Sequence, residues 1–184
     1  AEAGERYDVI ADACEVAILE SSKPTIAAID GVCVGGGMGL AVCCDFRIAS
    51  RGARFGITAA RLGIIYGLTE TRILYDLVGP SSAKRILMTG EIFPVEAAEN
   101  MGLLQSLVES NALAAAQSFA GKLSENAPLS VMGAKKIIAS LTNGTADQEK
   151  QGIEQRVLDA FDSEDYREGQ KAFLEKRKPN FKGY

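Results

Sequence analysis

A run of glycines limits the possible folds of this chain more than any other feature of its sequence. In the stretch DGVCVGGGMGLAVCCD, which begins at Asp30, four of the five residues from Gly35 to Gly39 are glycines. The preceding KPTIAAID is a short apolar run typical of a strand covered on both faces, and the residues after the glycines follow a helical pattern. A strand that passes through glycines into a helix brings free backbone N–H groups and the positive end of the helix dipole to one point. The sequence therefore predicts an anion site, either a phosphate cradle or an oxyanion hole.

The spacing of these glycines decides only weakly what the turn binds. It fits neither the phosphate-loop pattern GxxxxGK[ST] nor the complete dinucleotide pattern GxGxxG, so a nucleotide-binding module is the remote alternative. The same glycines could also serve only to pack a helix tightly on a strand. Both alternatives stay open on spacing alone.

The rest of the chain predicts an α/β layer followed by helices. Strands are expected over 25–29, 46–50, 53–57 and 103–108. A first helix is expected up to about residue 20, because apolar residues recur at helical spacing at Val9, Ile10, Ala13, Val16 and Ala17. A second helix is expected directly after the glycines. Further helices are expected over 69–79, 80–90, 95–101, 112–125, 129–141, 147–161 and 165–177. We therefore divide the chain into residues 1–110 and an all-helical region, 111–184. The helical region is a lid or an oligomerisation element, or it packs on its own core.

Composition and charge exclude several classes of function. The 184 residues carry a formal net charge of −4 and no basic run, so no surface for nucleic acid or an anionic membrane is expected. No apolar run approaches the roughly 20 residues of a membrane span. Residues 1–20 are too acidic for a signal peptide, which predicts a cytoplasmic protein.

The histidine and cysteine content removes further chemistry. The chain contains no histidine, so Ser–His and Cys–His nucleophiles and histidine metal sites are unavailable. Cys14, Cys33, Cys43 and Cys44 lack a CxxC spacing and are expected to be buried small hydrophobes. No metal site is predicted, and proton transfer requires Asp, Glu, Tyr, Lys or water.

The motif KPTIAAIDGVCVGGGMGLAVCCDFRIAS closely resembles the enoyl-CoA hydratase/isomerase, or crotonase, superfamily, whose pattern is KPxIAAxxGxxxGGGxxLAxxCDxxxA. The resemblance continues through ARFGITAARLGI, GPSSAKRILMTGEIFPVEAAENMGLLQSLV and SEDYREGQKAFLEKRKPNFKG, from about Tyr7 to the end. It implies an α/β fold with a crotonase-like spiral of ββα turns and a C-terminal helical trimerisation region. It also implies acyl-CoA thioester substrates, a homotrimer or hexamer, and no cofactor beyond the coenzyme A of the substrate.

The resemblance also assigns residues to roles. Gly36 matches the family glycine whose N–H polarises the thioester carbonyl. Phe173 and Lys176 match positions that meet the adenine and phosphate of coenzyme A. For Lys176, an ordinary solvated lysine on a helix face is an equal alternative.

Two positions depart from the family pattern. The family's hydratases carry one catalytic glutamate two residues beyond the third glycine and another in FGxPE, where this chain has Gly39 and Ala59. Neither residue can accept a proton, which puts classical hydration and the glutamate-shuttle isomerase scheme in doubt. Tyr66 falls where related decarboxylases place a pocket tyrosine, and Glu70 could act as an acid or base.

Each of these polar groups has a structural alternative. Tyr66 could be a packed aromatic residue with a satisfied hydroxyl. Glu70 is favourable in the first turn of a helix, and this explanation outweighs the functional one. Thr58 and Thr69 are lesser candidates, and Thr69 is expected to be a helix cap.

The resemblance predicts that part of the site is missing. The family's first oxyanion N–H comes from an AGAD-like loop upstream of the first helix, and this sequence contains no such segment. Either the chain is a fragment that lacks the N-terminal part of the spiral, which we favour, or another copy or chain completes the fold.

Three classes of function follow. An acyl-CoA enzyme that stabilises a thioester enolate is favoured, with decarboxylation of a malonyl-type thioester or thioester hydrolysis through Tyr66 and Glu70 as its variants. A noncatalytic acyl-CoA-binding protein is the second class. A nucleotide-binding module is the third.

Overall fold

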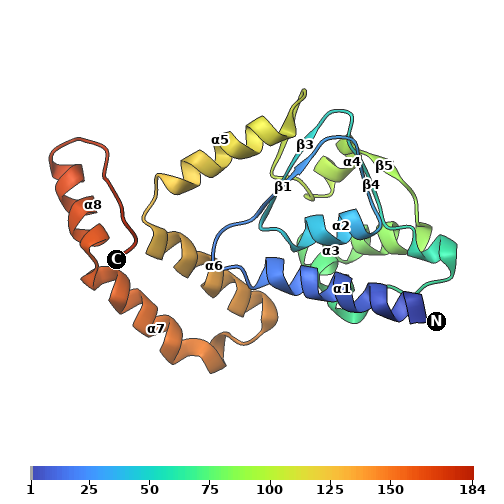
Figure 1. Cartoon of the computed structure of the whole chain (residues 1–184), viewed down its shortest axis with the longest axis horizontal. Coiled ribbons are helices and arrows are strands. Elements are labelled where there is room, and N and C mark those ends of the chain that lie inside the picture. The colour runs from blue at the N-terminus through green and yellow to red at the C-terminus, as the bar shows by residue number, and fades with distance from the viewer. Residues whose placement is uncertain (1) are drawn as a thin grey trace. The chain divides into compact units, whose positions relative to one another are not determined.

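The structure of the chain is a computed structural model that describes residues 2–184, with side chains from Ile10 onward (Figure 1). It divides into two compact units. The first contains the residues up to Ser21 and Thr25–Gln117, and the second contains Ser22–Pro24 and Ser118–Tyr184. Compactness does not show that either unit folds independently, so the division at residue 110 stays a prediction.

Two small sheets form the centre of the first unit (Figure 1). The first has the order β1-β3-β6, formed by the parallel strands Ile26–Ile29, Phe46–Ser50 and Ser106–Val108. The second has the order β2-β4-β5, formed by Val32–Val34, Arg54–Gly56 and Phe93–Pro94, with only the β4 and β5 pair antiparallel. The predicted α/β arrangement is confirmed, and β5 is a strand that the sequence pattern did not reveal.

Gly31 divides the apolar segment before the glycine turn into two strands. Its φ of 92° lies in the region that favours glycine, and the chain turns there from β1 into β2. The predicted strand over 25–29 is β1. The strand that leads directly into the glycines is β2, which belongs to the other sheet.

Helices follow the strands, as the sequence predicts. In the first unit they are α1 (Glu2–Leu19), α2 (Gly36–Cys43), the 3₁₀ turn η1 (Ala59–Leu62), α3 (Leu68–Thr89) and α4 (Val95–Asn100). Gly79 interrupts α3 with a φ of 73° and a ψ of 169°, immediately before Pro80. Proline cannot continue the helical hydrogen bonding, so α3 corresponds to the two helices predicted on either side of residue 79.

The core of the first unit lies between the second sheet and the helices that flank it. The rings of Phe55 on β4 and Phe93 on β5 stack with their centroids 6.2 Å apart. Other large side chains that are fully buried are Met38, Ile57, Leu74, Ile86, Val95 and Leu103. Met38 belongs to α2, so the helix that follows the glycines is anchored in this core.

Helix α1 does not turn the predicted apolar face inward. Ile10 and Val16 are 56% and 46% exposed, whereas Ala11, Glu15 and Ile18 are half-buried. These three residues are four and three positions apart, so they share one side of the helix. The apolar spacing correctly predicted a helix, but its packed side includes a carboxylate. The side chain of Val9, which belongs to the predicted face, lies outside the described residues.

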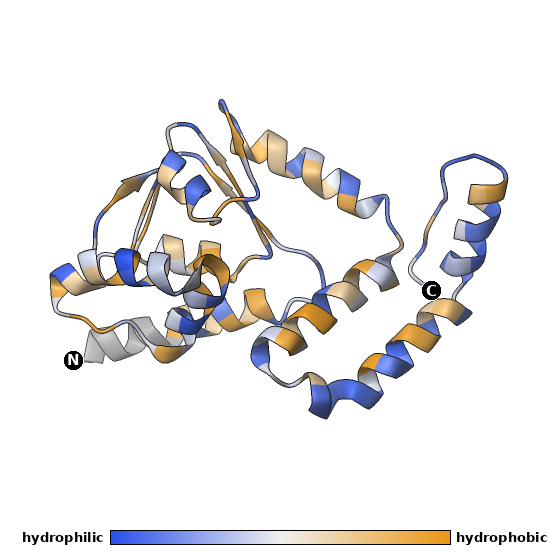
Figure 2. Cartoon of the chain, turned by 180° about the vertical axis from the view of Figure 1, so that it is seen from behind, coloured by the Kyte–Doolittle hydropathy of each residue, from blue (hydrophilic) through white to orange (hydrophobic). Residues whose placement is uncertain are grey.

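The second unit contains the remaining helices. They are the end of α5 (Ala112–Ser124), α6 (Pro128–Asn143), α7 (Ala146–Asp162) and α8 (Glu164–Leu174). Apolar segments run along α6 and α7 (Figure 2). Large apolar side chains that stay exposed on these two helices are Ile138, Leu141, Val157, Leu158 and Phe161.

The last residues of the chain fold back on α8. The carboxylate of Asp165 accepts hydrogen bonds from the N–H groups of Lys182 and Gly183, at 2.6 and 2.8 Å. Glu168 accepts two hydrogen bonds from the Arg177 guanidinium, at 2.6 and 2.9 Å. The hydrogen bond from Arg177 lowers the pKa of Glu168 to about 2.

Within the described part of the chain, we find no helix whose length and hydrophobicity would allow it to cross a membrane. The cytoplasmic location stays a prediction.

Candidate functional site

The glycine turn opens α2 and leaves its first N–H groups available. Gly35 has a φ of 59° and a ψ of −125°, a conformation open to glycine but strained for other residues. Its N–H donates to the carbonyl of Gly56 at 3.0 Å, which ties the turn to β4, and its own carbonyl accepts the N–H of Gly39 at 3.0 Å. Gly36 is therefore the first residue of the helix, and its N–H has no helical acceptor. Among the residues whose side chains are described, none caps this end, and Gly36 and Gly37 are exposed.

Gly39 lies one turn further along α2, on the same side as Gly36. A Cβ atom at Gly39 would lie 2.7 Å from Oε1 of Glu15 and 3.3 Å from the hydroxyl oxygen of Tyr66. A carboxylate and a phenol thus occupy the approach to position 39 because the residue there has no side chain. The structure brings Tyr66 to the helix that begins at Gly36, and it adds Glu15, which the sequence did not single out.

Three carboxylates lie close together beside Gly39. One oxygen from each of Asp12, Glu15 and Glu70 lies within 4.8 Å of the other two. Partial burial, then the charges of Glu70 and Asp12, raise the pKa of Glu15 above its ordinary value. Glu15 therefore keeps a proton at a higher pH than an isolated glutamate. Exposed acidic groups often lie together without a cation, and we assign no ion to this cluster.

Tyr66 and Glu70 come from the segment that leads into α3. Tyr66 is half-buried and packs against the core of the first unit. Glu70 is half-buried in the first turn of α3, where a carboxylate interacts favourably with the helix dipole. Its carboxylate also occupies the place of a side chain at Gly67. The position of Glu70 thus agrees with the structural alternative, a carboxylate at a helix N-terminus, and Glu70 also lies close to Glu15.

Thr58 and Thr69, the lesser candidates for site residues, are not among the side chains found beside Gly39. Thr69 is the second residue of α3 and is exposed, and the N-cap is Gly67, so the predicted cap at Thr69 is wrong. Thr58 precedes η1 and makes no side-chain cap hydrogen bond. Ala59, where the resemblance places a second glutamate, begins η1.

Arg47 holds the opposite end of α2. It is 4% exposed and donates to the carbonyls of Leu103 at 2.7 Å, Cys44 at 2.6 Å, and Ala41 and Asp45 at 3.3 Å each. The carbonyls of Ala41 and Cys44 are among those that an α-helix leaves unpaired at its C-terminus. Arg47 thereby fixes the helix that presents the glycine turn.

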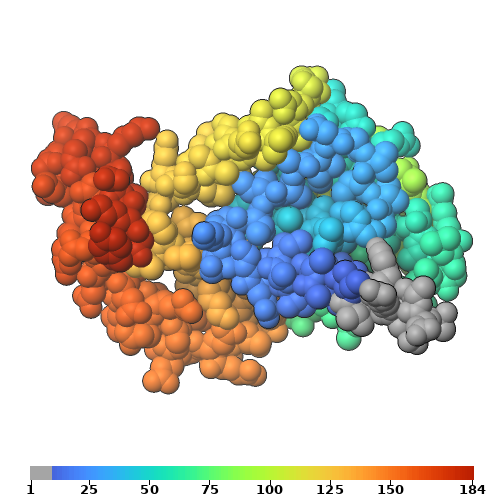
Figure 3. Space-filling model, in the orientation of Figure 1, coloured from blue at the N-terminus to red at the C-terminus, as the bar shows by residue number. Residues whose placement is uncertain are grey.

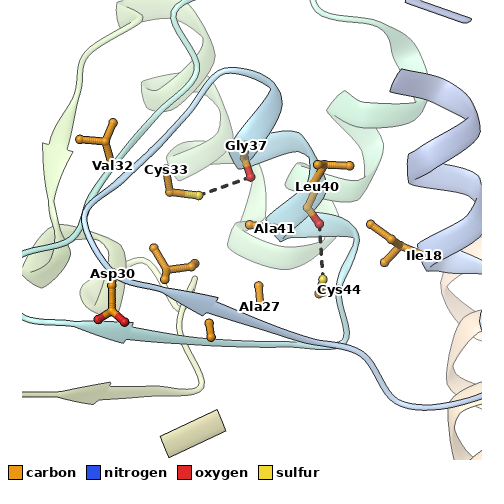
Figure 4. Close-up of a pocket in the computed structure, with 11 residues that line it drawn as sticks. Ile18, Ala27, Asp30, Val32, Cys33, Gly37, Leu40, Ala41 and Cys44 are labelled. Carbon is orange, nitrogen blue, oxygen red and sulfur yellow. Dashed lines mark hydrogen bonds between the residues drawn. The ribbon is translucent and has the colours of Figure 1, made fainter. Parts of the chain in front are cut away.

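A hollow of about 270 Å³ lies on the other side of α2, against β1 (Figure 4). Ile18, Leu40 and Cys44 line it together with the backbone of Gly37. Its wall is mainly apolar, and Glu15, Tyr66 and Glu70 do not belong to it. In the space-filling view, the dark blue residues of α1 lie at the surface (Figure 3). The polar groups and the hollow thus approach the same short helix from different sides.

Two buried cysteines, Cys33 and Cys43, lie near the ends of α2. Burial raises the pKa of Cys33 to about 11 and the pKa of Cys43 to about 12, so both stay thiols. Both are buried, as predicted. Cys14 is exposed and Cys44 is half-buried, so the prediction that all four are buried is wrong for these two.

Phe173 and Lys176 lie in the second unit. Phe173 is in the last turn of α8 and is 83% exposed. Lys176 follows the helix with a φ of 54°, and its N–H donates to the Phe173 carbonyl at 3.2 Å. Lys176 is exposed and lies just beyond the end of the helix rather than on its face, so the alternative of an ordinary solvated lysine stays open. Contact with coenzyme A stays a prediction for both residues.

Comparison with known proteins identifies the family. A sequence model described as enoyl-CoA hydratase/isomerase matches residues 7–184. The (E)-benzylidenesuccinyl-CoA hydratase of Thauera aromatica is 40% identical over 164 residues, which cover 88% of this chain and 63% of that protein. The crotonyl-CoA hydratase of Syntrophomonas wolfei is 38% identical and is matched over 86% of this chain and 62% of its own length.

Solved structures agree with this assignment. An enoyl-CoA hydratase/isomerase family protein from Hyphomonas neptunium has a TM-score of 0.88 and 42% identity, over 98% of this chain and 68% of that chain. An enoyl-CoA hydratase/carnithine racemase from Magnetospirillum magneticum has a TM-score of 0.90 and 30% identity, over 100% and 68%. The chain belongs to the enoyl-CoA hydratase/isomerase family and has the crotonase fold. It spans slightly less than two thirds of the length of the curated relatives named above.

Residue spacing alone does not tell which side of α1 faces α2, so Glu15 was not predicted. The one indication is Gly39 itself, since a helical glycine in a packed position leaves space that a neighbour fills.

Proposed function

We propose that this protein is an acyl-CoA-transforming enzyme that stabilises a thioester enolate at the N-terminus of α2. The observation that carries the proposal is the Gly36 N–H, which the Gly35 conformation places at an exposed helix start without a helical acceptor. A thioester oxygen that accepts this N–H becomes more negative as the enolate forms. A preorganised donor at such an oxygen is typically worth about 3 kcal/mol of transition-state stabilisation.

Family membership supports the substrate class. The relatives named above are hydratases of CoA thioesters, and a dienoyl-CoA isomerase of Dictyostelium discoideum is 30% identical over 167 residues. The exposed apolar side chains of Leu62, Ile64, Ile65 and Leu68 flank Tyr66 and suit an acyl chain. We further propose that Phe173 and Lys176 contact the adenine and phosphate of coenzyme A.

The assembly is part of the same proposal. We propose a homotrimer or hexamer, in which the exposed apolar residues of α6 and α7 are covered by neighbouring copies. Their number on two consecutive helices exceeds the scattered exposure that is ordinary on a monomer.

Decarboxylation is the second candidate reaction. At Gly39 and Ala59 no side chain can accept a proton, and the Tyr66 hydroxyl lies beside Gly39. Loss of CO₂ from a malonyl-type thioester leaves its electron pair in the enolate, which then takes a proton at the same carbon. This reaction needs oxyanion stabilisation and a hydrogen-bonding group more than a pair of carboxylates.

Mass spectrometry of acyl-CoA products tests the proposal. Protein expressed from the complete open reading frame is incubated with crotonyl-CoA and, separately, with methylmalonyl-CoA. A product heavier by one water supports hydration, and loss of CO₂ supports decarboxylation. Tight binding without turnover of a wider acyl-CoA panel would indicate a noncatalytic family member. Failure to bind any CoA thioester would overturn the proposal.

A further inference from the structure

We propose that Glu15 on α1 supplies the acid/base carboxylate of this site. This inference rests on the proposed function, and it names a group that neither the glycine motif nor the family resemblance assigns. Its basis is the convergence of Glu15, Tyr66 and the open N-terminus of α2 around the side of the helix that carries Gly36 and Gly39.

The position of the carboxylate is the first argument. Oε1 of Glu15 lies 2.7 Å from the place of a Cβ at Gly39, and the Tyr66 hydroxyl lies 3.3 Å from the same place. Gly36 and Gly39 are three residues apart, which corresponds to about 4.5 Å along a helix axis. A thioester whose oxygen accepts the Gly36 N–H would therefore have its α-carbon within reach of this region.

The orientation of α1 is the second argument. The helix leaves Ile10 and Val16 exposed and half-buries Glu15 against α2. The packed side also carries Ala11 and Ile18, but a carboxylate loses hydration when it is packed beside other carboxylates. Arrangements that break the local rules of folding concentrate at functional sites.

The charges around Glu15 are the third argument. Asp12 on α1 and Glu70 on α3 raise its pKa, in addition to the effect of burial. From α2 it faces the Cys43 thiol, whose own raised pKa reflects the charge of Glu15, and from the loop before α3 it faces Tyr66. A carboxyl that gains and loses its proton nearer neutral pH is better suited to proton transfer.

The proposed step is a single proton transfer. The ionised Glu15 takes the α-proton of the thioester, the C–H electron pair becomes the C=C bond of the enolate, and the carbonyl electron pair moves onto the oxygen beside the Gly36 N–H. Return of the proton to the α-carbon reverses each change. In heavy water the carboxyl exchanges its proton for deuterium before the return, so the α-carbon gains deuterium.

Deuterium uptake by butyryl-CoA tests this step without knowledge of the natural acyl group. The variants are Glu15→Gln, Glu15→Asp and Gly39→Ala, and the matched control is Glu20→Gln, an exposed glutamate just beyond the end of α1. We expect Glu15→Gln to lower the exchange rate about 100-fold or more. Glu15→Asp restores part of it, and Glu20→Gln leaves it unchanged.

Gly39→Ala displaces the carboxylate without removing it. The new methyl group would lie 2.7 Å from Oε1 of Glu15, a flexible side-chain end that can move aside. Alanine is favourable inside a helix, so the variant should fold. We expect a loss of exchange that approaches the loss in Glu15→Gln, and no further loss when the two changes are combined.

Two readouts separate catalysis from a structural role. The exchange rate of the unmodified protein should fall as the pH is lowered through the raised pKa of Glu15, and Glu15→Gln should lose this limb of the profile. Because the folded state prefers protonated Glu15, ionisation of this carboxyl lowers the free energy of unfolding. This loss of stability is absent below the ordinary pKa of about 4.5 and reaches its full size above the raised pKa. Glu15→Gln should therefore keep or raise the Tm at pH 7.

The outcomes distinguish this inference from the proposed function. Exchange that persists equally in Glu15→Gln overturns the role of Glu15 and leaves the acyl-CoA enzyme intact. A Tm that falls in Glu15→Gln together with unchanged exchange assigns Glu15 to structure alone. Binding of butyryl-CoA without exchange in the unmodified protein overturns the inference, and absence of binding overturns the proposed function as well.

Discussion

The two ends of helix α2 are treated in opposite ways by the sequence around them. At the N-terminus three glycines precede the first core residue, no side chain caps the helix, and the first N–H groups face an exposed surface. At the C-terminus Arg47 donates to the carbonyls of Ala41 and Cys44, and it is almost completely buried. An α-helix leaves unpaired groups at both ends, and among the described residues side-chain donors or acceptors meet these groups at the C-terminal end but do not cap the N-terminal end. On the proposed function, the open end binds the thioester oxygen, while the closed end holds the helix in place.

The largest effect on this comparison should come from Arg47→Met. The change leaves the carbonyls of Leu103, Ala41 and Cys44 without their buried donor. A buried polar group without a partner costs about 1–3 kcal/mol, so we expect the free energy of unfolding to fall by about 3 kcal/mol or more. Urea denaturation followed by circular dichroism measures it.

Arg51→Met is the matched control for this variant. Arg51 is an exposed arginine paired with Glu109 at 2.8 Å, and surface pairs contribute about 0–1 kcal/mol. Similar losses of stability in the two variants would contradict the structural role of the closed end.

The next effect should come from Gly36→Pro. Proline removes the N–H but is favoured at the first position of a helix, where that N–H has no helical partner. We expect kcat/KM for the acyl-CoA substrate to fall about 100-fold or more, as it does when an enzyme loses one oxyanion donor, with little change in Tm.

Gly36→Ala retains the N–H and separates loss of the donor from the effect of added carbon atoms. Its loss of activity should be much smaller. Equal activity of Gly36→Pro and the unmodified protein would show that the open end of α2 does not bind the thioester oxygen.

The sequence predicts the open end far better than the closed one. The glycine pattern locates the turn because the turn depends only on the backbone conformation and on where the helix starts. Residues adjacent in the chain determine both. Arg47 reaches a carbonyl 56 positions away, on Leu103, which no local pattern reveals. Glu15 was missed for the same reason: the spacing of Ile10, Val16 and their apolar neighbours predicts a helix, but the side that faces α2 is decided by tertiary packing.

The predicted elements agree with the structure where residues adjacent in the sequence set the boundary of the element. Gly79 and Pro80 divide α3 at the expected place, and 46–50 is the strand β3. The short strand β5 has only two residues and is defined by its partner β4, so periodicity could not reveal it. The cap predicted at Thr69 is wrong because the helix begins at Leu68 and its N-cap is Gly67.

The smallest effect should come from Thr25→Val, which tests whether the two ends of α2 are independent. The Thr25 hydroxyl donates to the Asp45 carboxylate at 3.0 Å and accepts the Asp45 N–H at 3.1 Å, just beyond the closed end. Valine has nearly the same shape, and the Thr25 N–H can still donate to Asp45 at 2.7 Å, so we expect a loss of about 1 kcal/mol in the free energy of unfolding. The eight residues of α2 separate this contact from Gly36 by about 12 Å, so activity should stay within about twofold of the unmodified protein. A loss of activity larger than the loss of stability would mean that the position of the Gly36 N–H depends on the closed end, and the functional and structural ends of the helix would then be a single coupled unit.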